Sequence, residues 1–259
     1  MKQLSSMHAL VWIIGSLLFI PGAVYKGART LCRPQYKMDY LCRVVQTGPQ
    51  KEALKTPYLA EIIQLSADKP VLAQQFDLVL ARRKLQSSPV IKSALLRVIK
   101  PDTVFIDYTV RQPIAWLYDF ENVALDEEGV PFPIIPFFSP KKLPELVLGL
   151  KTYAWSLPLK DEKTSLALTL LKMMLEKSLN VLRLDVTVSF APSLGQREVV
   201  VILEENGFSK FLRLTPKNFA QELGNYLELR KTLPPETQVI DLRISQLAFI
   251  ESKKKCVNL

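Results

Sequence analysis

The turn Asp126-Glu127-Glu128-Gly129 comes closest to a catalytic pattern in this sequence. Neighbouring carboxylates can act as general acid and general base, which would suit a hydrolase. The same run also fits a solvated turn of acidic residues. Because no nucleophile or metal partner accompanies these acids, we predict no catalytic residue, no metal and no cofactor. A carboxylate-dependent hydrolase attached to a membrane remains an alternative.

Histidine and cysteine are scarce. The only histidine is His8, so a Ser-His-Asp triad, a Cys-His dyad or a His-ligated zinc is not available to the rest of the chain. Cys32, Cys42 and Cys256 show no Cys-x-x-Cys spacing, and their odd number leaves at least one thiol unpaired. Spacing alone does not decide whether Cys32 and Cys42 form a disulfide.

The chain is basic, with a formal net charge of +9 over 259 residues. A charge of this size could serve nucleic acid or an anionic membrane surface. The Lys and Arg residues are scattered, without a basic helix or interleaved aromatic residues. We therefore interpret them as solvated faces and predict no nucleic-acid partner.

The N-terminal segment Ala9–Tyr25 has no charged residue over its 17 positions. This length is at the short end of the range of roughly 17–25 residues for a membrane helix. We predict a cytoplasmic tail at 1–8, an uncleaved transmembrane helix at 9–25 and a juxtamembrane linker at 26–38. A cleavable signal peptide is the alternative.

Hydrophobic patterning predicts a small domain over residues 39–117. A strand at Tyr40–Val45 is followed by a helix that starts at Thr56-Pro57 and by an amphipathic helix at Val71–Leu85, with Leu72, Phe76, Val79 and Leu80 on its apolar side. Val90–Ile99 and the alternating residues from Val104 to Val110 predict two hairpinned strands. The predicted order is β-α-α-β-β.

A second domain is predicted over residues 118–250, with a flexible tail at 251–259. Prolines at 131, 133, 136 and 140 argue against a regular central strand there. A helix from Asp161 to about Leu179 and a strand with apolar positions from Leu182 to Phe190 follow. Asn206-Gly207 predicts a hairpin, Thr215-Pro216 begins the last helix, and Val239–Ile250 is the final strand.

Several short motifs resemble the FtsQ/DivIB family of bacterial cell-division proteins. The matching motifs are Pro101-Asp102, Ile106-x-Tyr108, Arg111-x-Pro113-x-Ala115, Asp126-x-x-Gly129 and Ile240-Asp241-Leu242-Arg243. The chain departs from the family at Val110, where members usually carry an acidic residue. The resemblance implies an α+β chain with an N-terminal transmembrane helix, a small POTRA domain (β-α-α-β-β) and a mixed or antiparallel β domain with two helices.

The resemblance also implies a function. It predicts a scaffold of the bacterial divisome in the inner membrane, with most of the chain extracytoplasmic, although Lys26, Arg29, Arg33 and Lys37 outnumber Lys2 and favour the opposite orientation. The implied partners are division proteins of the FtsB/DivIC and FtsL types, with no small-molecule substrate. The alternative is another POTRA-bearing protein that acts in polypeptide transport or outer-membrane protein assembly.

Two groups of site residues follow from the resemblance. A partner segment would pair with the last strand, which is an edge strand, and contact Ile244, Ser245, Leu247 and Phe249. Leu247 and Phe249 are equally compatible with side chains that face the core of an ordinary strand. The residues of the predicted domain junction are Arg111, Pro113, Asp126 and Gly129, with a charge-assisted hydrogen bond expected between Arg111 and Asp126.

Overall fold

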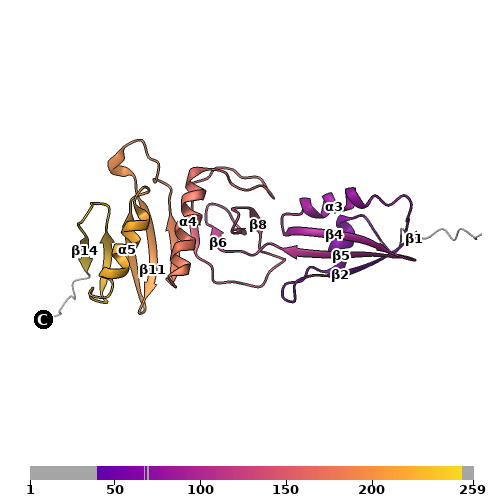
Figure 1. Ribbon diagram of the computed structural model, residues 1–259, viewed down its shortest axis with the longest axis horizontal. Coiled ribbons are helices and arrows are strands. Elements are labelled where there is room, and N and C mark those ends of the chain that lie inside the picture. Colours follow the sequence, from indigo (N-terminus) through magenta and orange to yellow (C-terminus); the bar gives the residue numbers. More distant parts are fainter. Residues whose placement is uncertain (1–39, 67, 69, 253–259) are drawn as a thin grey trace, which may run out of the picture. The chain divides into compact units, whose positions relative to one another are not determined.

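The computed structural model describes residues 40–66, 68 and 70–252. These residues form a mixed α/β fold with four α-helices, a nine-stranded sheet, a three-stranded sheet and a two-stranded sheet (Figure 1).

The three-stranded sheet shows the period-two burial of a sheet that is covered on one face. Its strands are β2 (Arg43–Thr47), β4 (Ile91–Ile99) and β5 (Thr103–Val110). The spatial order is β2-β5-β4, with β2 parallel and β4 antiparallel to β5. Every second residue of β5 is buried, beginning with Val104. The helices α2 (Thr56–Ile62) and α3 (Leu78–Ser87) add Leu59 and Leu85 to the same core.

The prediction of one helix from Val71 to Leu85 is wrong. Val71–Leu72 forms the short strand β3, which pairs antiparallel with β1 (Tyr40–Leu41). The helix α3 begins only after Asp77.

The cap of α3 explains the difference. The Asp77 carboxylate accepts hydrogen bonds from the backbone N–H groups of Val79 at 2.9 Å and Leu80 at 3.0 Å, which fixes the first turn of the helix. With this start, Ala81 and Leu85 face the core, while Val79 and Leu80 are exposed.

The nine-stranded sheet contains every strand from β6 onward. Its strands are β6 (Ala115–Leu117), β7 (Val123–Leu125), β8 (Pro131–Pro133), β9 (Glu145–Val147), β10 (Val181–Asp185), β11 (Val199–Glu205), β12 (Phe208–Leu214), β13 (Thr237–Asp241) and β14 (Phe249–Ser252). The spatial order is β14-β13-β12-β11-β10-β9-β6-β7-β8. The strand β9 is parallel to β6 and β10, and β12 is parallel to β13, while the other pairs are antiparallel. The strand β6, which the sequence placed in the small domain, thus belongs to the larger sheet.

Two helices pack against the nine-stranded sheet in one hydrophobic cluster. They are α4 (Glu162–Glu176) and α5 (Phe219–Leu229), and a short 3₁₀ helix, η1 (Leu194–Gln196), precedes β11. Residues in register across neighbouring strands are buried with both helices in one hydrophobic cluster: Leu184, Val201, Leu212 and Ile240.

The strand β7 is buried on both faces. Val123 and Leu125 belong to the hydrophobic cluster of the large sheet, whereas Ala124 belongs to the cluster that includes the three-stranded sheet. One three-residue strand therefore contributes to two cores.

The proline-rich segment lies at one edge of the large sheet. Two of the three residues of β8 are prolines, which are tolerated at an edge. Beyond the strand, the Asn122 side chain takes the place of a strand neighbour. It accepts a hydrogen bond from the N–H of Ile135 at 2.8 Å and donates one to its carbonyl oxygen at 2.9 Å.

Two predicted strands are shorter than the sequence pattern suggests. The strand β10 ends at Asp185, whose carboxylate accepts a hydrogen bond from Thr187 N at 2.8 Å and turns the chain, and Phe190 is exposed. The predicted strand Val239–Ile250 is divided into β13 and β14, which pair antiparallel.

The division of the last strand has a local cause. Gln246 has a φ of +62°, and Leu247 N donates to the carbonyl oxygen of Ile244 at 3.1 Å, so the chain makes a tight turn. Residues 242–248, between β13 and β14, are called the edge loop below.

The predicted fold class needs correction. The predicted class is α+β, with an N-terminal transmembrane helix, a small POTRA domain and a mixed or antiparallel β domain with two helices. The described residues instead form a mixed α/β fold with four helices and a nine-stranded sheet. Among them, no helix is long and apolar enough to span a bilayer. The segments predicted as tail, transmembrane helix and linker lie outside the described residues, as do 253–259 of the predicted flexible tail.

Candidate functional site

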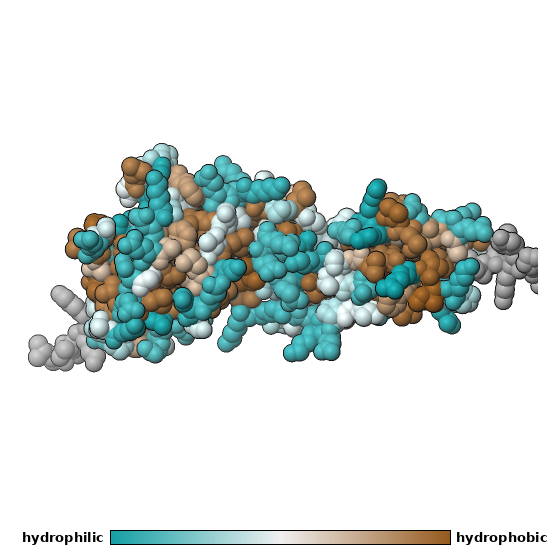
Figure 2. Space-filling view, in the orientation of Figure 1, coloured by the Kyte–Doolittle hydropathy of each residue, from teal (hydrophilic) through white to brown (hydrophobic). Residues whose placement is uncertain are grey.

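The strand β14 forms the second edge of the nine-stranded sheet. All four of its residues are exposed, including Phe249 at 55% and Ile250 at 46%. Among the described residues, no strand pairs with its outer side. Figure 2 shows hydrophobic residues among hydrophilic ones where Figure 1 labels β14. An edge strand with an unpaired outer side can accept an additional strand.

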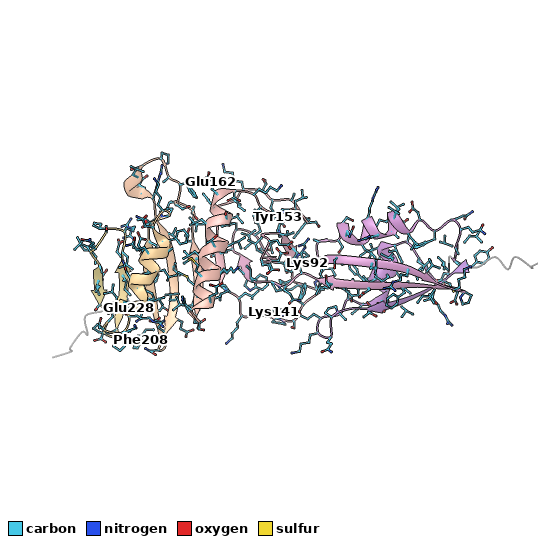
Figure 3. All side chains as sticks on the ribbon, viewed as in Figure 1. Lys92, Lys141, Tyr153, Glu162, Phe208 and Glu228 are labelled. Atoms are coloured by element: carbon cyan, nitrogen blue, oxygen red, sulfur yellow. The ribbon has the colours of Figure 1, made fainter. Side chains whose placement is uncertain are left out.

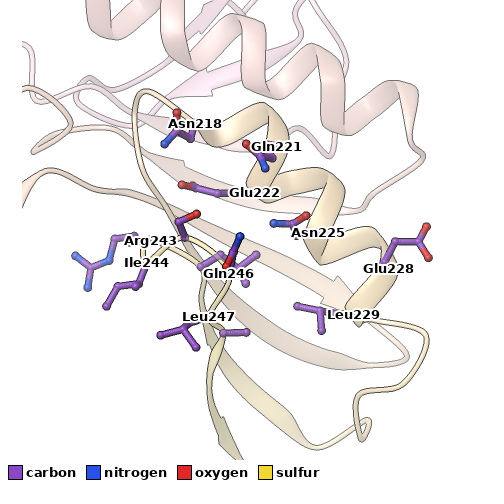
Figure 4. A pocket seen from close by; sticks show the side chains of 13 residues that line it. Asn218, Gln221, Glu222, Asn225, Glu228, Leu229, Arg243, Ile244, Gln246 and Leu247 are labelled. Atoms are coloured by element: carbon purple, nitrogen blue, oxygen red, sulfur yellow. The ribbon is translucent and has the colours of Figure 1, made fainter.

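A groove lies beside this edge, between α5 and the edge loop, with a volume of about 520 Å³ (Figure 4). Three side-chain amides of α5 and its N-cap line one wall: Asn218, Gln221 and Asn225. Ile244 and Leu247 of the edge loop line the other wall and are more than half exposed. The groove thus offers amide donors and acceptors opposite aliphatic side chains.

The α5 wall is held in place by an internal hydrogen-bond pair. The Glu222 carboxylate accepts hydrogen bonds from Thr215 N and Thr215 Oγ1, both at 2.6 Å. Glu222 is buried, so its carboxylate fixes the start of α5 and leaves the three amides on the open side of the helix.

The structure places the four predicted partner-binding residues in two elements. Ile244, Ser245 and Leu247 lie in the edge loop and line the groove, whereas Phe249 lies on β14. None of the four faces the core; all are exposed. Their role in binding remains a prediction.

The α5 amides were not among the predicted site residues. Asn218, Gln221 and Asn225 follow the spacing i, i+3, i+7 of a single helix face, and this pattern is visible in the sequence. The sequence does not show that the edge loop lies beside that face, because it predicts one continuous strand there.

Four charged residues join the start of the edge loop to the neighbouring strands. Arg243 donates to the Asp241 carboxylate through two nitrogen atoms, Nε at 3.0 Å and Nη2 at 2.7 Å. Arg213 contacts Asp241 at 3.3 Å and Glu198 at 2.9 Å, and Arg243 Nη1 lies 3.1 Å from Glu198. Positive and negative groups alternate around a closed set, which we call the ion ring (Glu198, Arg213, Asp241 and Arg243).

The ring sets the charge state of Asp241. Burial alone would raise the pKa of this carboxyl, but hydrogen bonds from Arg243 and the charge of Arg213 outweigh it and hold the pKa below its usual value. The hydrogen bonds to Asp241 in turn raise the pKa of Arg243. These shifts favour the charged forms of both Asp241 and Arg243.

The structure also brings together two of the predicted junction residues. Arg111 Nη1 donates to Asp126 Oδ2 at 2.6 Å, and both side chains are at least 90% buried. The second oxygen, Asp126 Oδ1, accepts hydrogen bonds from Glu128 N and Val130 N at 3.0 and 2.9 Å. Arg111 follows β5 and Asp126 follows β7, so this ion pair links the two sheets.

The other acids of this turn are also paired. Lys92, labelled in Figure 3, lies 3.1 Å from Glu127 and 3.0 Å from Glu128. The hydrogen bond with Lys92 lowers the pKa of Glu128. The hydrogen bonds with Glu128 and Glu127 raise the pKa of Lys92. Each carboxylate of the candidate acid–base turn therefore has a cationic partner.

The two remaining junction residues act on the backbone. Pro113 lies between β5 and β6, where the chain passes from one sheet to the other. Gly129 has a φ of +74°, and an added Cβ would lie 3.1 Å from Leu168 of α4, so a larger residue is disfavoured at this turn. In the part of the chain that the structure describes, no cluster of His, Cys, Asp and Glu side chains is placed to hold a metal ion.

Comparisons with known proteins do not identify the chain. No protein-family model matches it, and no curated protein matches it.

Proposed function

We propose that this protein is a non-catalytic binding protein of the bacterial divisome, and that a segment of a partner protein adds to β14 as an extra strand. The observation that supports this most directly is the exposed, proline-free edge strand β14 with the groove beside it. Strand addition supplies main-chain hydrogen bonds, while side chains of the partner contact the groove and give specificity.

The chemistry of the surface favours a polypeptide as the ligand. The backbone of β14 offers donors and acceptors in a row, and the α5 amides can hydrogen-bond to a further stretch of peptide. Ile244, Leu247 and Phe249 offer apolar contact to its side chains. The motifs shared with FtsQ/DivIB proteins point to partners of the FtsB/DivIC and FtsL types.

A charge placed on this surface tests the proposal. Phe249→Asp and Leu247→Asp would put a carboxylate into the interface, and we expect each to lower retention of the FtsB/DivIC-type protein by at least about tenfold in a pull-down. Phe208→Asp and Leu157→Asp are matched controls, since Phe208 is 47% and Leu157 61% exposed, away from the groove. Figure 3 labels Phe208.

Depletion in cells tests the biological role. We expect septum formation to stall when the protein is depleted and to recover with the wild-type chain or the control variants, but not with Phe249→Asp. Normal division after depletion would contradict the divisome role. Full retention of the partner by Phe249→Asp and Leu247→Asp would contradict the edge-strand mechanism.

A further inference from the structure

The edge loop is held by side chains from β12 and from the residue that precedes β11. Apart from Asp241 and Arg243, the ion ring contains Glu198, which immediately precedes β11, and Arg213, which is on β12. Glu198 and Arg213 do not line the groove. Their side chains are 21% and 36% exposed, so solvent screens their ion pairs only in part.

The contacts of the ring converge where β13 ends. The Asp241 carboxylate also accepts a hydrogen bond from Arg243 N at 3.1 Å, and Leu242 N donates to the carbonyl oxygen of Arg213 at 3.0 Å. Leu242 is buried, whereas Ile244 is 53% exposed. The chain thus passes from the core to the surface within two residues, next to Arg243 of the ion ring.

We propose that Glu198 and Arg213 are positioning residues for the partner-binding surface: they hold the start of the edge loop so that the loop forms a wall of the groove and β14 stays in register. This inference rests on the function proposed above. It concerns residues outside the predicted binding surface and does not require either of them to touch the partner.

The contacts give Arg213 and Glu198 different roles in the ion ring. Arg213 bridges the two carboxylates, so its removal leaves Glu198 and Asp241 to share only Arg243. Glu198 bridges the two guanidinium groups, so its removal weakens the hold on both. Because the four charges form one network, their contributions should be non-additive.

The test combines exchange and binding measurements on the full chain. We expect Arg213→Gln to raise amide hydrogen exchange across residues 242–252 about fivefold and to weaken binding of the FtsB/DivIC-type probe about fivefold. Arg213→Lys should give a smaller loss, because lysine keeps the charge but not the forked contact. The double variant Glu198→Gln/Arg213→Gln should be little worse than Arg213→Gln alone.

Arg183→Gln is the matched control. Arg183 is also 36% exposed, pairs with Glu145 on the same sheet and lies away from the edge loop. It should change neither the exchange of residues 242–252 nor probe binding.

The outcomes separate this inference from the proposed function. Unchanged exchange in Arg213→Gln would overturn the positioning role, and if binding fell in that case, Arg213 would contact the partner directly. Faster exchange with no wild-type binding of the probe would support loop positioning and overturn the proposed partner. If Arg183→Gln changed exchange and binding as much as Arg213→Gln, the ion ring would only stabilise the fold in general. That result would overturn the inference.

Discussion

The two edges of the nine-stranded sheet differ in almost every respect that governs strand addition. At one edge, β8 has three residues, two of which are prolines without an N–H group, so it can offer at most one donor to another strand. At the other edge, β14 has four exposed residues and no proline. Two of the three residues of β8 are buried, whereas a groove lies beside β14.

Proteins commonly block exposed sheet edges, because open edges promote aggregation. Two prolines limit pairing at β8, whereas β14 is open and exposes Phe249 and Ile250, which suggests that the second edge has a use. This contrast within one sheet is stronger support for a binding role than the exposure of any single side chain, since isolated exposed hydrophobic residues are common.

The largest effect on partner affinity should come from placing a proline in β14, as β8 has two. Ile250→Pro removes a donor from the strand and disturbs its ladder, so we expect partner affinity to fall at least about tenfold, since one hydrogen bond contributes up to about 1.5 kcal/mol and 1.4 kcal/mol is a factor of ten. Titration calorimetry with the FtsB/DivIC-type protein measures the change. Circular dichroism on the same sample checks that the fold is kept, and undiminished affinity would count against strand addition.

A smaller effect should follow from removing the hydrogen bonds that join the start of β7 to the chain after β8. Asn122→Ala removes both hydrogen bonds to Ile135 and places alanine at a φ of +56°, so we expect the free energy of unfolding to fall by about 1–2 kcal/mol. Urea denaturation measures it. Asn122→Gly keeps the backbone conformation available and should lose less, while partner binding should be unaffected by either variant.

The smallest effect is expected when the pH is lowered and Asp241 becomes protonated. Because the folded-state pKa of Asp241 lies below its unfolded value of about 3.9, its stabilisation is present above that pH and is lost as the pH falls through the lowered pKa. We expect exchange in the edge loop, corrected for the intrinsic rate, to rise as the pH falls below about 4. The hydrogen bonds between Asn122 and Ile135 involve no titratable group. An equal rise in exchange at the Ile135 amide would therefore contradict an effect that is local to Asp241 and the edge loop.

The sequence predicts those elements whose burial and turn chemistry agree. The strand β5 alternates without interruption, Asp161 caps α4, and Asn206-Gly207 turns the hairpin of β11 and β12 with both residues at positive φ. In each case the local pattern and the tertiary contacts point to the same structure, so the pattern is sufficient.

The failures have a different origin. Val71–Leu85 and Val239–Ile250 each have the apolar spacing of one element, but a side-chain cap in the first and a tight turn in the second divide them. The candidate site is affected in the same way, because a sequence that predicts one strand cannot place the edge loop beside α5. The pairing of β9 with β6 and β10 is equally non-local and leaves no trace in a short window of residues.

The double burial of β7 bears on how the molecule responds to load. A force applied to the three-stranded sheet would act on Ala124, while its neighbours Val123 and Leu125 pack in the other hydrophobic cluster. Such a force would therefore act on two packed clusters at one strand of three residues, and insertions or bulky replacements there should be poorly tolerated.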